Sequence, residues 1–122
     1  MYDKELAREI LTQIYQATRT VLERFEPIKS ADGFTSSVSG MEKLDAICMQ
    51  LIAIGEGLKN LDKITGNTLL TQYPEIEWKK VKGMRDIISH HYFDLDAEAI
   101  FEVCKNHIAP LSDTLEKMIK EL

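Results

Sequence analysis

The segment from Arg85 to Phe93, RDIISHHYF, holds the side chains of this chain best suited to chemistry. Arg85 can hold a phosphate through two planar N–H donors. His90 and His91 are acid/base groups with an ordinary pKa of about 6.5. Tyr92 adds a hydroxyl, which is a usable nucleophile where it is exposed. These residue types indicate chemistry on a phosphate group.

The spacing of these residues permits a cluster on a helix but does not demand one. At about 100° per residue, Arg85, Ser89 and Tyr92 fall at i, i+4 and i+7 and share a face. His90 lies about 140° from Arg85 on a regular helix and reaches its side if the helix ends or tightens near Ser89. A structural interpretation also fits, in which the histidine interacts with the helix dipole and the tyrosine packs the end of a bundle.

A short basic run precedes this segment. Lys79, Lys80 and Lys82 lie close before Arg85 in a chain whose net charge is −5. The acidic total argues against broad, non-specific nucleic-acid binding, whereas a local basic surface can attract a phosphate. The three lysines are therefore candidate RNA-binding residues, and a solvated helix face is the alternative.

Other catalytic templates are absent from the sequence. It contains no Gly-x-Gly-x-x-Gly, P-loop, His-Glu-x-x-His, EF-hand loop or Gly-x-Ser-x-Gly elbow. His90 and His91 are adjacent, so on a helix they diverge and make a poor metal pair. We therefore expect no metal site and no cofactor.

The elements that must position the segment are helical. The 122 residues are expected to form one domain, 1–122, with four long segments of helical period and no strand alternation. These run from about residue 3 to 25, from a cap at Ser37 or Ser39 to residue 61, from about 76 to 90–93, and from Asp96 to the C-terminus, with a kink or the start of a second piece at Pro110. Gly55 and Gly57 inside the second helix indicate close approach of another helix. The predicted fold is all-α, an antiparallel up-and-down bundle of four to five helices.

The cysteines and the apolar segments of the sequence indicate the cellular compartment. Cys48 and Cys104 lie far apart in the sequence without ligand spacing, and we expect both to be reduced core residues. No signal peptide or apolar run long enough for a membrane span is evident. The expected location is the cytoplasm.

The arrangement Arg-x4-His-x-Tyr, formed by Arg85, His90 and Tyr92 near a helix end in a small all-α domain, resembles the HEPN superfamily, most closely the HepT toxins of MNT–HEPN pairs. The resemblance covers nearly the whole chain. The stretches that carry it are IGEGLKN, YPEIEWKKVKGMRDIISHHYFDLD and HIAPLSDTLEKM.

The resemblance implies a metal-independent endoribonuclease toxin of a type VII-like toxin–antitoxin system, acting as a homodimer. In this scheme His90 is the acid/base group and Arg85 holds the phosphate, while Ser89 and His91 are supporting candidates and His91 is the alternative catalytic histidine. The partner would be an MNT-type nucleotidyltransferase antitoxin that attaches AMP to Tyr92. Two other interpretations stay open: a non-catalytic HEPN module that binds a nucleotidyltransferase or a nucleotide, and a helical scaffold without a site.

Overall fold

The computed structural model describes residues 2–90 and 96–122, except the side chains of Ser89 and His90, and all regular structure in these ranges is helical. The predicted all-α class is confirmed. The elements are α1 (Lys4–Phe25), α2 (Asp32–Thr35), α3 (Val38–Thr65), the 3₁₀ helix η1 (Leu70–Gln72), α4 (Trp78–Lys82), α5 (Met84–His90), α6 (Ala97–Asn106) and α7 (Ile108–Glu121).

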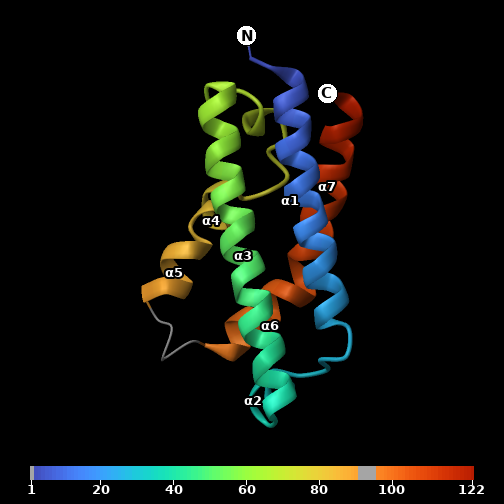
Figure 1. Cartoon of the computed structure of the whole chain (residues 1–122), viewed down its shortest axis with the longest axis vertical. Coiled ribbons are helices and arrows are strands. Elements are labelled where there is room, and N and C mark those ends of the chain that lie inside the picture. Colours follow the sequence, from blue (N-terminus) through green and yellow to red (C-terminus); the bar gives the residue numbers. More distant parts are fainter. Residues whose placement is uncertain (1, 91–95) are drawn as a thin grey trace.

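Three long helices form the body of the bundle. α1 runs antiparallel to both α3 and α7 and packs against both, and the two termini lie at the same end of the molecule (Figure 1). α4 and α5 lie beside the middle of α3, while α6 crosses the lower half of the bundle. The described part of the candidate segment, residues 85–90, is thus carried on a short helical arm against α3.

α1 forms where the sequence predicts it. Asp3 caps its first turn, with Oδ1 accepting a hydrogen bond of 3.1 Å from the backbone N–H of Leu6. The helix ends at Phe25, two residues before Pro27. On this helix Leu6 is exposed, whereas Leu11 is buried in the core.

α3 begins at the first of the two predicted caps. The Ser37 hydroxyl accepts a hydrogen bond from the Gly40 N–H at 2.9 Å, so Ser37 and not Ser39 is the cap. The helix ends at Gly66, whose φ of 62° is left-handed and suits glycine.

The third and fourth predicted helices are each divided. Gly83 separates α4 from α5, and His107 separates α6 from α7. The second break precedes Pro110, which sits in the first turn of α7, where its missing N–H costs no intrahelical hydrogen bond. Asp96 caps α6 as predicted, accepting from the N–H groups of Glu98 and Ala99.

One apolar core runs through the bundle. Its most deeply buried side chains come from α1, α2, α3, α5, α6 and α7, among them Leu11, Phe34, Leu58, Ile88, Cys104 and Leu115. Ile88 ties α5 to this core, while Arg85, three residues earlier, is exposed. In the described part of the chain, no helix is long and apolar enough to cross a membrane.

Candidate functional site

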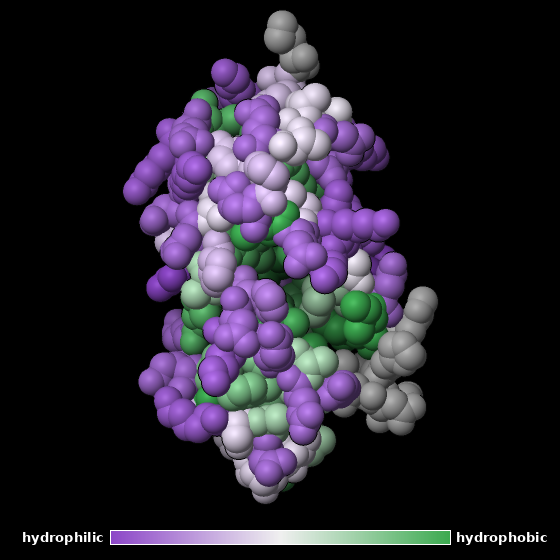
Figure 2. Space-filling view, turned by 180° about the vertical axis from the view of Figure 1, so that it is seen from behind, coloured by the Kyte–Doolittle hydropathy of each residue, from purple (hydrophilic) through white to green (hydrophobic). Residues whose placement is uncertain are grey.

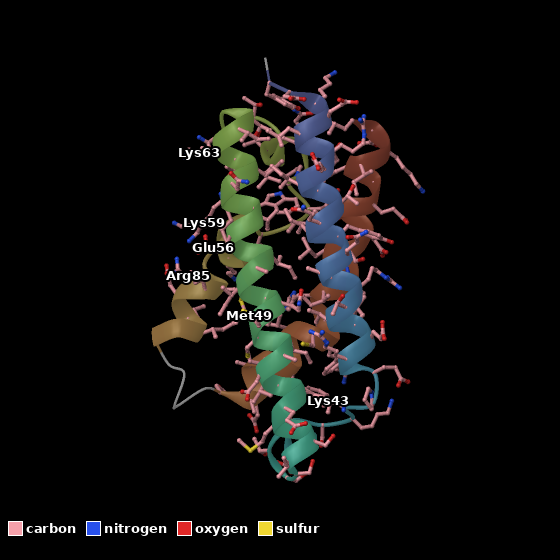
Figure 3. The ribbon with its side chains drawn as sticks, in the orientation of Figure 1. Lys43, Met49, Glu56, Lys59, Lys63 and Arg85 are labelled. Atoms are coloured by element: carbon pink, nitrogen blue, oxygen red, sulfur yellow. The ribbon has the colours of Figure 1, made fainter. Side chains whose placement is uncertain are left out.

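Arg85 lies at the surface of α5 and is bound by a residue of α3. Its Nη1 donates a hydrogen bond of 2.7 Å to Oε1 of Glu56, and the two side chains are 56% and 40% exposed. Figure 3 shows this pair at the edge of the bundle where α5 meets α3, with Lys59 and Lys63 farther along the same edge. A guanidinium at this edge can reach solvent and an anionic ligand.

The close approach of α4 to α3 occurs at Gly55. A Cβ atom there would lie 3.0 Å from the carbonyl oxygen of Val81 and 3.3 Å from that of Lys82. At Gly57 a Cβ would lie 2.7 Å from Cγ1 of Ile14 on α1. The predicted reason for the two glycines is confirmed: each admits a neighbouring helix, and Gly55 admits the helix that leads into Arg85.

A partly buried ion pair between Lys82 of α4 and Asp62 of α3 also connects these two helices. Nζ of Lys82 lies 2.5 Å from Oδ2 of Asp62, with side-chain exposures of 28% and 12%. Such a pair is costly to break, because removing one partner leaves the other charge with little water around it. Lys82 stays a candidate RNA-binding residue, and its ammonium is paired with a carboxylate of α3.

The other two predicted lysines lie differently. Lys80 forms an exposed i,i+3 pair with Glu77, at 3.0 Å. Lys79 lines an open hollow of ≈ 380 Å³ together with Lys59, Asp62 and Lys82. Lys79 and Lys82 therefore line one hollow with Lys59 of α3, whereas Lys80 is paired locally with Glu77.

The segment before α4 is anchored on α7. Trp78 Nε1 donates to the carbonyl oxygen of Tyr73 at 2.8 Å, and the Tyr73 hydroxyl donates to Oε1 of Glu121 at 2.6 Å. Burial, and then the Glu121 carboxylate, raises the pKa of Tyr73 to about 12, so the phenol stays protonated as the donor. These bonds hold the start of α4 in place.

A second hollow lies on the opposite face of α5. This groove of ≈ 870 Å³ is apolar in its interior, with Ile54, Val81, Met84, Ile87 and Ile108 among its lining residues. Figure 2 shows hydrophobic residues in a hollow between hydrophilic ones on the face turned away in Figure 1. Ile87 follows Arg85 by two positions, which point to nearly opposite sides of a helix, so the groove is separate from the Arg85 surface.

The comparisons with known proteins identify the family. A family model described as "Ribonuclease HepT-like" matches residues 7–118. The chain belongs to this family. No solved structure gives a significant match.

Relatives of this HepT-like chain carry ribonuclease names. A "Putative RNase" of Caldanaerobacter subterraneus subsp. tengcongensis is 30% identical over 94% of this chain and 92% of its own length. A "Probable ribonuclease HepT" of Thermococcus cleftensis is 33% identical over 62% of this chain and 64% of its own length. A "Putative RNase" of Methanocaldococcus jannaschii is 31% identical, and the match spans 63% of this chain and 60% of that relative.

The predicted motif is only partly within the described residues. Arg85, Ser89 and His90 belong to the backbone of one helix, α5, which continues without a break through His90. α5 is described only as far as His90, one residue after Ser89, so the turn of His90 toward Arg85 stays a prediction. The side chains of Ser89 and His90, and the whole of His91 and Tyr92, lie outside the described residues. Their roles stay predictions.

Sequence reasoning missed Glu56 and Asp62, the two α3 carboxylates that bind Arg85 and Lys82. A weak signal for Glu56 existed, since it is a charged residue between Gly55 and Gly57 where other helices approach. The described residues contain no group of three His, Cys, Asp or Glu side chains arranged to hold a metal ion.

Proposed function

We propose that this HepT-like protein is an endoribonuclease toxin that cleaves RNA without a metal ion, in the cytoplasm, as a homodimer. The observation that carries the proposal is the exposed guanidinium of Arg85, held on the same helix as His90 in a chain whose family is named for ribonucleases. Arginine suits a phosphodiester because its donors match two phosphate oxygens and its charge opposes the negative charge that grows in the transition state.

The proposed reaction needs a base, an acid and an anion-binding group. A base removes the proton of an RNA 2′-OH, whose oxygen then bonds to the adjacent phosphorus. The bond from phosphorus to the 5′-oxygen breaks, and an acid gives that oxygen a proton, leaving a 2′,3′-cyclic phosphate and a 5′-hydroxyl. His90 is the proposed acid/base group. A second copy of the chain would supply a second histidine, so that one acts as base and the other as acid.

The test is cleavage of RNA in EDTA by the purified protein and its variants. We expect the His90→Ala variant to lose about 10²–10⁴-fold in rate, as is typical for an acid/base group. Arg85→Lys should also lose activity, because an ammonium lacks the planar pair of donors. If His91→Ala is inactive and His90→Ala is not, the two histidines exchange roles. Absence of cleavage by a folded parent protein would favour the non-catalytic module.

The proposal includes its regulation by an MNT-type nucleotidyltransferase, which attaches AMP to Tyr92. An added phosphate in the RNA site would repel RNA by charge and exclude it by bulk. Co-expression with such a partner should add AMP mass to the peptide that contains Tyr92, and Tyr92→Phe should remove it. An unmodified Tyr92 in neutralised protein would mean inhibition by binding alone.

A further inference from the structure

We infer that Glu56 is a positioning residue of the ribonuclease site, which fixes the direction in which Arg85 presents its guanidinium to a phosphate. The inference rests on the proposed function in one respect: it takes Arg85 as the phosphate-binding residue. Its basis is the contact between α3 and α5, in which Glu56 Oε1 accepts from Arg85 Nη1 at 2.7 Å.

The contact has little to do with stability. Both partners are about half exposed, at 56% and 40%, and exposed ion pairs contribute little to the free energy of unfolding because water and salt screen them. A short charge-assisted hydrogen bond does, however, restrict orientation. It occupies one donor of the guanidinium and leaves other N–H groups of the same plane for an anion.

Glu56 is well placed to act as a fixed reference. It lies inside the 28-residue helix α3, next to Gly55, against which the carbonyl oxygen of Val81 packs. Six residues farther along, Asp62 binds Lys82. α3 therefore holds α4 at Gly55 and Asp62, and Glu56 holds the first turn of α5. The contacts at Gly55 and Asp62 fix the position of the arm that carries Arg85, and Glu56 fixes the orientation of the Arg85 guanidinium.

Two other roles for Glu56 predict different results. A carboxylate that merely withholds Arg85 from RNA would slow the reaction, and its removal would speed it. A carboxylate that accepted the proton of the 2′-OH would control the acidic limb of the pH–rate profile. A positioning residue changes kcat without changing the shape of that profile.

The experiment compares Glu56→Gln and Glu56→Ala with a matched control, Glu75→Gln. Glu75 forms an equally exposed pair between distant segments, with Lys117 at 3.7 Å and exposures of 55% for Lys117 and 45% for Glu75. RNA cleavage in EDTA would be measured over a range of substrate concentrations and pH, and circular dichroism would establish folding.

We expect kcat to fall about 10-fold in Glu56→Gln, which keeps a neutral acceptor, and toward 100-fold in Glu56→Ala, a range typical of a displaced catalytic group. KM should stay constant or fall, because the variants lose a negative charge beside a polyanion. Glu75→Gln should match the parent within about 2-fold. Circular dichroism separates positioning from a loss of folded protein, which lowers apparent kcat only in proportion to the folded fraction and leaves KM unchanged.

Parent-like or faster cleavage by Glu56→Gln overturns the inference, and so does loss of the acidic limb of its pH profile. A second measurement is independent of cleavage. The ¹H–¹⁵N signal of the Arg85 side chain, assigned by its loss in Arg85→Lys, should show slow guanidinium rotation in the parent and fast rotation in Glu56→Gln. If the parent cuts no RNA, the proposed function fails, and this signal still decides whether Glu56 orients Arg85.

Discussion

The carbonyl oxygen of Val81 on α4 lies where Gly55 on α3 has no side chain, and a Cβ atom on Gly55 would come within 3.0 Å of it. The neighbour is backbone, so a methyl group at this position cannot be accommodated by a rotamer change. It must move α4 away from α3, and α5 with Arg85 follows α4 after a single residue, Gly83.

Gly55→Ala should therefore weaken both folding and the site. Overpacking costs about 1–3 kcal/mol, and the better helix propensity of alanine returns about 1 kcal/mol. We expect a net loss of about 1 kcal/mol in the free energy of unfolding by urea titration, with a larger proportional loss of RNA cleavage.

Gly57→Ala is the matched comparison, because its Cβ would meet the side chain of Ile14 on α1 instead of the arm. It should lower the free energy of unfolding, and the molecules that stay folded should cleave RNA at the rate of the parent. Equal losses of activity in the two variants, at equal stability, would contradict the link from Gly55 to Arg85.

The lysines of α4 should separate into structural and exposed residues. Asp62→Ala leaves the Lys82 ammonium, 28% exposed, without its carboxylate partner. We expect a loss of about 2 kcal/mol in the free energy of unfolding, below the range for a fully buried pair because water reaches Lys82. Thermal and urea unfolding measure this loss.

Lys80→Ala supplies the control for that pair. Its contact with Glu77 is exposed and local, so the change should stay within about 0.5 kcal/mol. Similar destabilisation by Asp62→Ala and Lys80→Ala would show that the Asp62–Lys82 pair does not fasten the arm.

Much of the bundle could be predicted from periodicity, since the apolar stripes of α1 and α3 determine which faces are buried. The breaks were harder to predict, because a glycine at position 83 and a proline at position 110 each fit a kinked or a continuous helix. Whether each helix breaks depends on packing. α4 has to run close to Gly55, and α7 begins at Ile108, before the proline. Neither arrangement produces a periodic pattern in the sequence.

The site was predictable only in its residue types. The sequence places Arg85 and the lysines close together, but charge patterning contains no information on which acid lies opposite. In the sequence, Glu56 lies 29 residues from Arg85 and Asp62 lies 20 residues from Lys82. The path of the chain through η1 brings the two members of each pair together in space. The pairing of Lys82 with Asp62 therefore could not be predicted from the sequence.

The two cysteines should be unreactive in the folded protein. Burial, with a smaller contribution from Asp45, raises the pKa of Cys48 to about 11, and burial followed by Cys48 raises that of Cys104 to about 12. Because the thiolate is the reactive form, alkylation by iodoacetamide at pH 8 should be far slower in buffer than in urea. Fast labelling of the folded chain would contradict the buried placement of both thiols.

The same shifts give a stability change with a defined sign. Both pKa values are raised on folding from the ordinary thiol value of 9.0, so the folded state favours the protonated thiols. Their contribution is complete below pH 9 and is lost as pH rises through about 11 and 12. We expect the free energy of unfolding to fall above pH 9, and to fall less steeply in a variant with both cysteines replaced by alanine.

The proposed homodimer should depend on the exposed face of α3 that leads to Glu56. Met49 is 63% exposed and precedes Glu56 by seven residues, two helical turns along the same face. A large apolar side chain near the proposed active site, which under the proposed mechanism takes a second histidine from another copy, is suited to contact with that copy. A dimer across this face would bring the two Arg85–Glu56 pairs toward one another.

Met49→Asp places a charge in that contact and should shift the molar mass measured by light scattering from twice 14.0 kDa to 14.0 kDa. RNA cleavage should fall with it and recover at high protein concentration, since mass action restores a weakened dimer. Leu6→Asp is the control, because Leu6 is 41% exposed on α1 and belongs to a different helix face. It should leave mass and cleavage unchanged. A parent protein that is already monomeric while cutting RNA, or a Met49→Asp variant that stays dimeric, would place the second histidine elsewhere than across this face.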